Sequence, residues 1–180
     1  MTPAEYIQLK AFARVDGALL ALLWTASFAC YVVGMKNPLY GMVALLLIVA
    51  TPFYVARRLR RFRDKDLQGV ISLMRGWAFV ILVFFYASIL LALVQYVYFA
   101  FMDHGYLLSS LQDTLSSPEA RQAVEQYGVT ESLNETIQMM GEMRPIDYAL
   151  NVLTVNITVG IILGLPVAAL MRRRREEIRR

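Results

Sequence analysis

Four long apolar stretches constrain this chain more than any other feature of its sequence. They cover residues 17–34, 39–56, 77–102 and 146–171, and charged or polar segments separate them. About 20 apolar residues in a helix span the hydrocarbon core of a bilayer. With 58% hydrophobic residues and a mean hydropathy of +0.49, the chain is too apolar for a soluble domain. The sequence therefore predicts an all-α polytopic membrane protein, a four-helix transmembrane bundle forming a single domain over residues 1–180.

The segments outside the apolar stretches carry helix signals of their own. Residues 2–16 read as an amphipathic helix that Thr2 caps and that continues into the first span. The third helix is expected to be long, over residues 70–102, and to project beyond the membrane. Between spans three and four, Ser-Pro and Gly punctuation predicts a small helical extracytoplasmic insertion over residues 103–145.

The basic residues are distributed unequally between the two predicted sides of the membrane. Fifteen Lys and Arg residues fall on one side, and three fall on the other: Lys36, Arg121 and Arg144. Basic residues favour the cytoplasmic side, so we expect both termini in the cytoplasm.

The basic inner face has two interpretations. It is a topology signal, or it attracts anionic lipid headgroups or a phosphate-bearing partner. Its residues form two clusters: Arg57, Arg58, Arg60, Arg61 and Arg63, then Arg172, Arg173, Arg174 and Arg175. Nucleic acid is not expected as a partner, because stacking aromatics other than Phe62 are missing from these clusters.

The last span carries a polar stripe of Asp147, Asn151, Thr154 and Thr158, spaced 4, 3 and 4 residues apart. At 100° per residue these side chains share one face of a helix. Polar groups at membrane depth need partners, so the stripe is expected to face the interior of the bundle. There it either hydrogen-bonds other helices or lines a ligand or ion site.

Small residues mark two faces for close helix packing. In the last span these are Asn156, Gly160 and Gly164, and in the first span they are Gly17 and Ala21. Small residues let helix backbones approach closely in membranes. The two faces are expected to pack together or to form the seam of a homo-oligomer.

Catalytic chemistry has little support in this sequence. A Gly-rich phosphate loop, a Ser/His/Asp set and paired carboxylates at membrane depth are all missing, and Cys30 is the single cysteine. Asp103, His104 and Asp147 fall on the same side, but His104 is the single histidine, so a metal or proton site there is not expected. We predict no catalytic residue, no metal site and no cofactor.

Two runs of residues resemble a known family. They are Arg75-Gly76-Trp77-Ala78-Phe79, which opens the third span, and Tyr96-Val97-Tyr98-Phe99-Ala100-Phe101-Met102-Asp103, which closes it. Together with the order of spans and loops, the chain resembles the four-span membrane proteins of Bacteroidota grouped as domain of unknown function 4199. The resemblance implies a multi-pass protein of a bacterial inner membrane. It also implies an association with polyprenyl-phosphate glycosyltransferases, and it defines no catalytic residues.

These observations give three hypotheses for function. The first is a non-enzymatic membrane subunit or anchor that recruits a polyprenyl-phosphate glycosyltransferase to the cytoplasmic face. The alternative is a small transporter or lipid-handling protein that uses the polar stripe of the last span. A third is an outer sensor, because 8 acidic and 2 basic residues lie between Asp103 and Asp147.

Overall fold

The computed structural model describes residues 2–173, and helices dominate this part of the chain. Four helices are long: α1 (Pro3–Gly34), α2 (Pro38–Arg61), α3 (Leu73–Phe101) and α7 (Pro145–Met171). Three short helices separate α3 from α7: α4 (Tyr106–Leu115), α5 (Pro118–Gln126) and α6 (Thr130–Glu142). A π-helical turn, η1 (Phe62–Asp66), extends α2. The predicted all-α class is confirmed.

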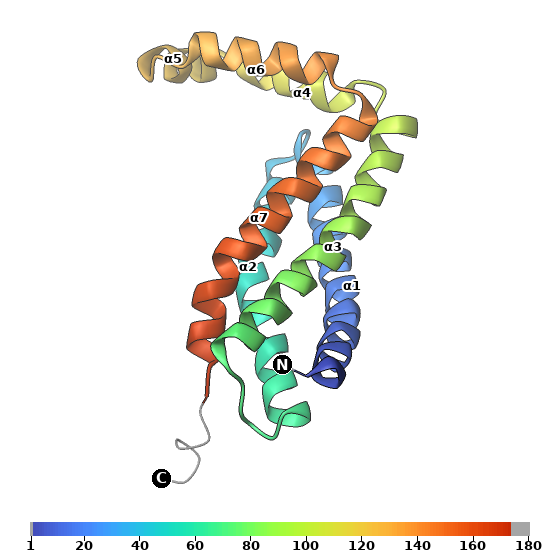
Figure 1. The fold of residues 1–180 in the computed structure, drawn as a ribbon. Coiled ribbons are helices and arrows are strands. Elements are labelled where there is room, and N and C mark those ends of the chain that lie inside the picture. The colour runs from blue at the N-terminus through green and yellow to red at the C-terminus, as the bar shows by residue number, and fades with distance from the viewer. Residues whose placement is uncertain (1, 174–180) are drawn as a thin grey trace.

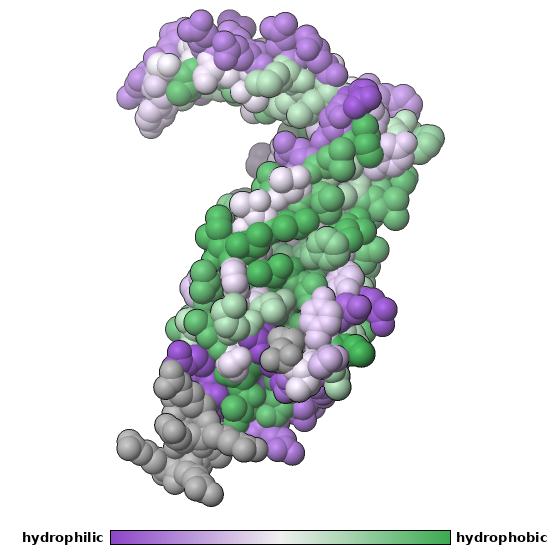
Figure 2. Space-filling view, in the orientation of Figure 1, coloured by the Kyte–Doolittle hydropathy of each residue, from purple (hydrophilic) through white to green (hydrophobic). Residues whose placement is uncertain are grey.

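All four long helices are long and apolar enough to cross a membrane. Their outer surfaces carry large apolar side chains, such as Leu22, Leu46 and Ile162, each more than 60% exposed. Figure 2 shows this apolar belt between two polar ends. A surface of this kind is stable in lipid and unstable in water, so the fold indicates a membrane protein.

The first helix starts as its sequence predicts. The Thr2 hydroxyl accepts a hydrogen bond from the Glu5 N–H, and the Glu5 carboxylate accepts one from the Thr2 N–H at 2.8 Å. This capping box satisfies backbone donors that the first helical turn leaves free. Residues 3–34 therefore form one continuous helix, which combines the amphipathic segment and the first span.

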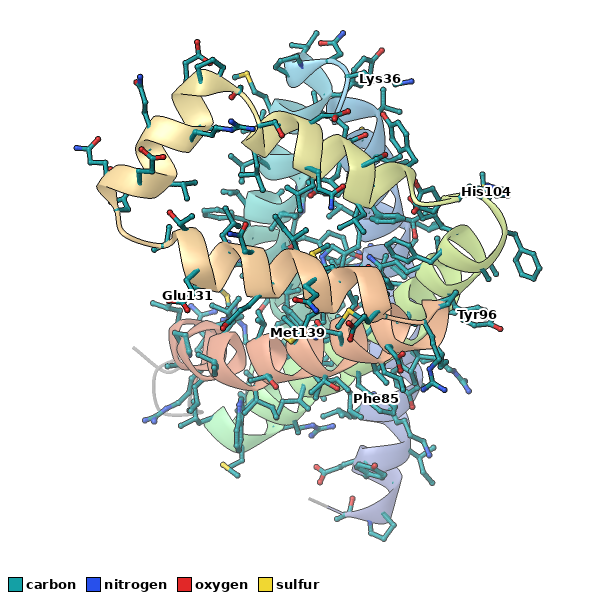
Figure 3. The ribbon with its side chains drawn as sticks, turned by 90° about the horizontal axis from the view of Figure 1, so that it is seen from above. Lys36, Phe85, Tyr96, His104, Glu131 and Met139 are labelled. Atoms are coloured by element: carbon teal, nitrogen blue, oxygen red, sulfur yellow. The ribbon has the colours of Figure 1, made fainter. Side chains whose placement is uncertain are left out.

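Helix α3 occupies the centre of the bundle. It packs along α1 on one side and along α7 on the other, while α2 packs mainly on α1. Figure 1 shows the start of α1 and the end of α7 at one end of the bundle, called the terminal end here, and the short helices across the other, called the insertion end. Seen from above, α4, α5 and α6 form a triangle over the insertion end (Figure 3). Their extracytoplasmic location stays a prediction.

One expectation about the segment between α2 and α3 was wrong, because α3 was expected to begin at residue 70 and begins at Leu73. Phe62 and Arg63, in the charged part of this segment, are buried. Phe62 stacks on Phe79 with ring centroids 4.9 Å apart, and Arg63 donates to the Met171 carbonyl at 2.9 Å, which α7 leaves free at its end. Helix α3 starts at Leu73, because Ile71 instead pairs its backbone with that of Arg173.

Candidate functional site

A cavity of about 750 Å³ lies between α2 and α7 in the half of the bundle next to the insertion end. Small-molecule sites in proteins measure about 300–1,000 Å³. All four long helices line the cavity, and Leu107 of α4 and Met140 of α6 complete its wall. Each of the four candidate spans therefore contributes side chains to the wall of this one cavity.

The cavity exists because α2 and α7 meet at the terminal end and separate towards the insertion end. At the terminal end, a Cβ placed on Gly76 of α3 would lie 3.3 Å from Ala168 of α7 and 3.6 Å from Leu59 of α2. Towards the insertion end, the facing residues of α2 and α7, including Ile48 and Val152, line open space instead.

Most of the cavity wall is apolar. It includes the side chains of Phe28, Ile48, Leu91, Phe99, Val152 and Leu163. Three polar side chains in the wall already donate to protein acceptors: Trp24 Nε1 to Thr51 Oγ1 at 3.0 Å, Ser27 Oγ to the Ala44 carbonyl at 2.9 Å, and Tyr148 Oη to the Met140 carbonyl at 2.6 Å. A wall with this composition favours hydrocarbon over water.

Gln95 is the exception in this wall. Its side chain is 7% exposed, and its Oε1 is buried without a hydrogen-bond partner among residues 2–173. Leaving such an acceptor unpaired costs about 1–3 kcal/mol. The half-buried Asn156 of α7 contributes a second amide further from the insertion end.

The polar stripe of α7 does not face the interior of the bundle, so the expected orientation was wrong. Asn151, Thr154 and Thr158 are exposed on the outer surface of α7. The Thr154 hydroxyl donates to the Leu150 carbonyl, and the Thr158 hydroxyl donates to the Thr154 carbonyl, each at 2.9 Å. Since these hydroxyls bond to their own helix, they need no partner from another span.

Asp147, at the start of the stripe, has a capping role. Its carboxylate accepts hydrogen bonds from the Arg144 backbone at 2.9 Å and from the Arg144 guanidinium at 3.0 Å. The bonded carboxylate raises the pKa of Arg144. Asp103 caps α4 in a similar way by accepting from the Gly105 and Leu107 N–H groups at 3.1 Å. Neither residue forms a metal-binding cluster with His104 in the described part of the chain.

Both faces of small residues pack on α3 and not on each other. A Cβ on Gly17 would lie 2.8 Å from the Val83 carbonyl oxygen, and a Cβ on Gly160 would lie 2.5 Å from Phe84 Cβ. A Cβ on Gly164 would lie 2.9 Å from Trp77 Cδ1. Ala21 is buried as well, while Asn156 turns towards the cavity. The expected pairing of α1 with α7, or a dimer seam on these faces, was wrong because α3 occupies both.

The arginines of the two predicted basic clusters divide into two groups. Arg58 donates to the buried Asp16 carboxylate, with Nε at 2.6 Å, and Arg63 bonds Asp64 and α7. These two guanidiniums hold helices together. The remaining described ones are exposed: Arg57, Arg60, Arg61, Arg172 and Arg173. Arg174 and Arg175 lie outside the described residues.

Two important residues escaped the sequence analysis. Asp16 is 4% exposed and joins α1 to α2 through Arg58, with the Tyr54 hydroxyl donating to its carbonyl at 3.3 Å. A lone acidic residue at the edge of a span, opposite an arginine of the same hairpin, was the available signal. Gln95, an uncharged polar residue within the third span, gave a comparable signal.

The comparisons with known proteins concern the family of the chain. Neither the curated proteins nor the solved structures contain a match to it. The model of the family described as "Protein of unknown function (DUF4199)" matches residues 16–173, which include α1 from Asp16 onward, the other three long helices and the residues that line the cavity. The chain therefore belongs to the DUF4199 family.

Proposed function

We propose that this protein is a lipid-handling membrane protein that binds the hydrocarbon chain of a membrane lipid in the cavity between α2 and α7. The observation that carries the proposal is the cavity itself, about 750 Å³ in volume and lined by apolar side chains from all four long helices. Hydrocarbon is the one ligand material that a bilayer supplies in excess at this depth.

The position of the opening supports a lipid over a water-soluble substrate. The two helices that diverge, α2 and α7, carry exposed apolar side chains such as Leu45, Ile48 and Val155. A ligand that enters between them passes from the lipid and never crosses water. The polar stripe of α7 lies on the exposed side of that helix, and within the described residues its threonine hydroxyls donate to their own helix, so a path for ions along the stripe has no support.

Trp24 offers a direct test, since it lines the cavity and the chain has only two tryptophans. In a Trp77→Phe variant purified in detergent, Trp24 is the single indole. Adding a fatty ester brominated at mid-chain should quench its fluorescence saturably at about one equivalent. Quenching that rises linearly with the ester concentration would show partition into the micelle and overturn the proposal.

Gly41 allows the cavity to be filled without disturbing the fold. It lines the cavity, and a Cβ at this position meets no atom within 4 Å. In the same background, Gly41→Leu should weaken saturable quenching about tenfold or more. Leu46 lies on the outer surface of α2 and is 66% exposed. Leu46→Phe therefore serves as the matched control and should bind the ester like the parent.

A second candidate function rests on the terminal end. Five arginines of the two basic clusters are exposed there: Arg57, Arg60, Arg61, Arg172 and Arg173. If this end faces the cytoplasm of a bacterial inner membrane, as the basic residues predict, it suits docking of anionic lipid or of a membrane-associated partner. In this reading the protein is a non-enzymatic subunit, and a polyprenyl-phosphate glycosyltransferase is the partner that the family resemblance suggests.

A further inference from the structure

We infer that the lipid bound in the cavity donates a hydrogen bond to Gln95 Oε1. The donor is an uncharged group, a hydroxyl or an amide N–H, at the point where the polar part of the lipid meets its hydrocarbon chain. The inference rests on the proposed function and names the chemical class of the ligand. Simple esters and ethers, which offer only acceptors at that point, are the class it disfavours.

Gln95 carries a buried oxygen that has no hydrogen-bond partner among the described residues. Its side chain lines the cavity and is more than nine-tenths buried, yet Oε1 contacts no donor of the described chain. Buried amide oxygens in proteins are almost always hydrogen-bonded. The missing donor therefore has to come from whatever occupies the cavity.

Three hydrogen-bond donors of the cavity wall already have acceptors within the protein. The donor groups of Trp24, Ser27 and Tyr148 are bonded to Thr51, Ala44 and Met140 respectively. Among the described residues, the buried Oε1 of Gln95 has no such partner. No Asp, Glu, Lys or Arg lines the cavity within residues 2–173, so a charged group would be desolvated there without a counter-ion.

The depth of Gln95 along α3 decides which part of a bound lipid lies beside it. Gln95 lies six residues before the end of α3 at Phe101, or about 9 Å at 1.5 Å per residue. Leu107 and Met140 close the wall beyond it, at the insertion end. A lipid whose chain fills the apolar part of the cavity therefore places the first group of its polar part beside Gln95.

Two probes of equal chain length test the inference: stearamide and methyl stearate, each brominated at mid-chain. They differ in the terminal group, which donates N–H in the amide and only accepts in the ester. Both quench Trp24 when bound to the Trp77→Phe protein. We expect the amide to bind about tenfold more tightly, the ratio that one net hydrogen bond supplies.

Gln95→Leu in this background should remove the preference by weakening the amide and leaving the ester unchanged or tighter. Tyr96→Phe, one residue along on the exposed side of α3, should keep the full preference (Figure 3). Gln95→Met, of similar length, repeats the measurement if the Leu variant does not fold.

The outcomes separate this inference from the proposed function. Saturable binding of both probes with equal affinity would overturn the inference, with water satisfying Gln95, and would leave lipid binding in place. A preference that survives in Gln95→Leu or Gln95→Met would also overturn it. Binding of neither probe would instead refute the proposed function.

Discussion

The two ends of the bundle use the same four helices differently. At the terminal end, charged and aromatic side chains tie each helix to a neighbour: Asp16 with Arg58, Glu5 with Arg75 at 3.1 Å, and Phe62 with Phe79. At the insertion end, α2 and α7 separate and leave a cavity of about 750 Å³. The contrast shows that four helices need not close along their whole length when one end holds them together.

The chemistry of each end explains the difference. Helices in lipid gain no hydrophobic energy from packing on one another, so their association depends on close contact and on polar bonds. The terminal end concentrates the polar bonds, and α3 supplies close contact to α1 and α7. Among the described residues, no side-chain hydrogen bond or ion pair joins α2 to α7 near the insertion end, and the cavity between the two helices leaves room for a lipid chain.

The most damaging single change should be the loss of the ion pair between α1 and α2. Asp16→Ala leaves Arg58 without its partner, and the Arg58 side chain is only 21% exposed. We expect a loss of about 3 kcal/mol in the free energy of unfolding, the lower part of the range for a broken buried pair. Unfolding in mixed micelles with increasing sodium dodecyl sulfate, followed by circular dichroism, measures this loss.

Two further variants make that test specific. Asp113→Ala, on the exposed surface of α4, should leave stability unchanged. Adding Arg58→Leu to Asp16→Ala should recover part of the loss, because the uncompensated charge is then removed. A loss below about 0.5 kcal/mol for Asp16→Ala would place the ion pair among weak surface pairs.

The exposed arginines of the terminal end should matter for lipid and not for folding. Replacing Arg57, Arg60 and Arg61 by Gln, with Arg58 and Arg63 kept, should weaken the retention of anionic lipid by up to about 3 kcal/mol at low salt. The difference should shrink at high salt because of screening. Native mass spectrometry of the lipid-bound protein counts the retained lipids.

The control for this triple variant uses arginines at the other end of the molecule. Arg121→Gln and Arg144→Gln, both exposed near the insertion, should not change the retention of anionic lipid. If the triple variant holds as much anionic lipid as the parent at low salt, the arginines act only as a topology signal and the docking proposal fails.

Two glycines should respond to the same substitution with opposite sign. Gly160→Leu places Cβ 2.5 Å from Phe84 Cβ, and overpacking of this kind costs about 1–3 kcal/mol. Gly41→Leu adds its side chain to the cavity and should gain up to about 1 kcal/mol from the better helix propensity. Thermal unfolding in detergent compares the two. A Gly160→Leu variant as stable as the parent would show that α7 does not depend on close contact with α3.

Much of the fold follows from local patterns in the sequence. The four apolar stretches, the Thr2 cap of α1 and the turn around Asn37 depend on residues close in the chain, so their positions were predictable. The buried faces of the spans were not predictable, because lipid and protein interior are equally apolar. The outward stripe of Asn151, Thr154 and Thr158 shows this, since local backbone bonds make its threonines tolerable against lipid.

The candidate site shows the same division. The sequence alone determined that this chain forms four apolar helices with a basic excess on one predicted side, because length, hydropathy and charge are properties of single segments. Only the tertiary structure decided that α3 lies between α1 and α7, that Asp16 finds Arg58, and that Gln95 faces a cavity. Those outcomes depend on the register and spacing between helices distant in the chain, which no local pattern specifies.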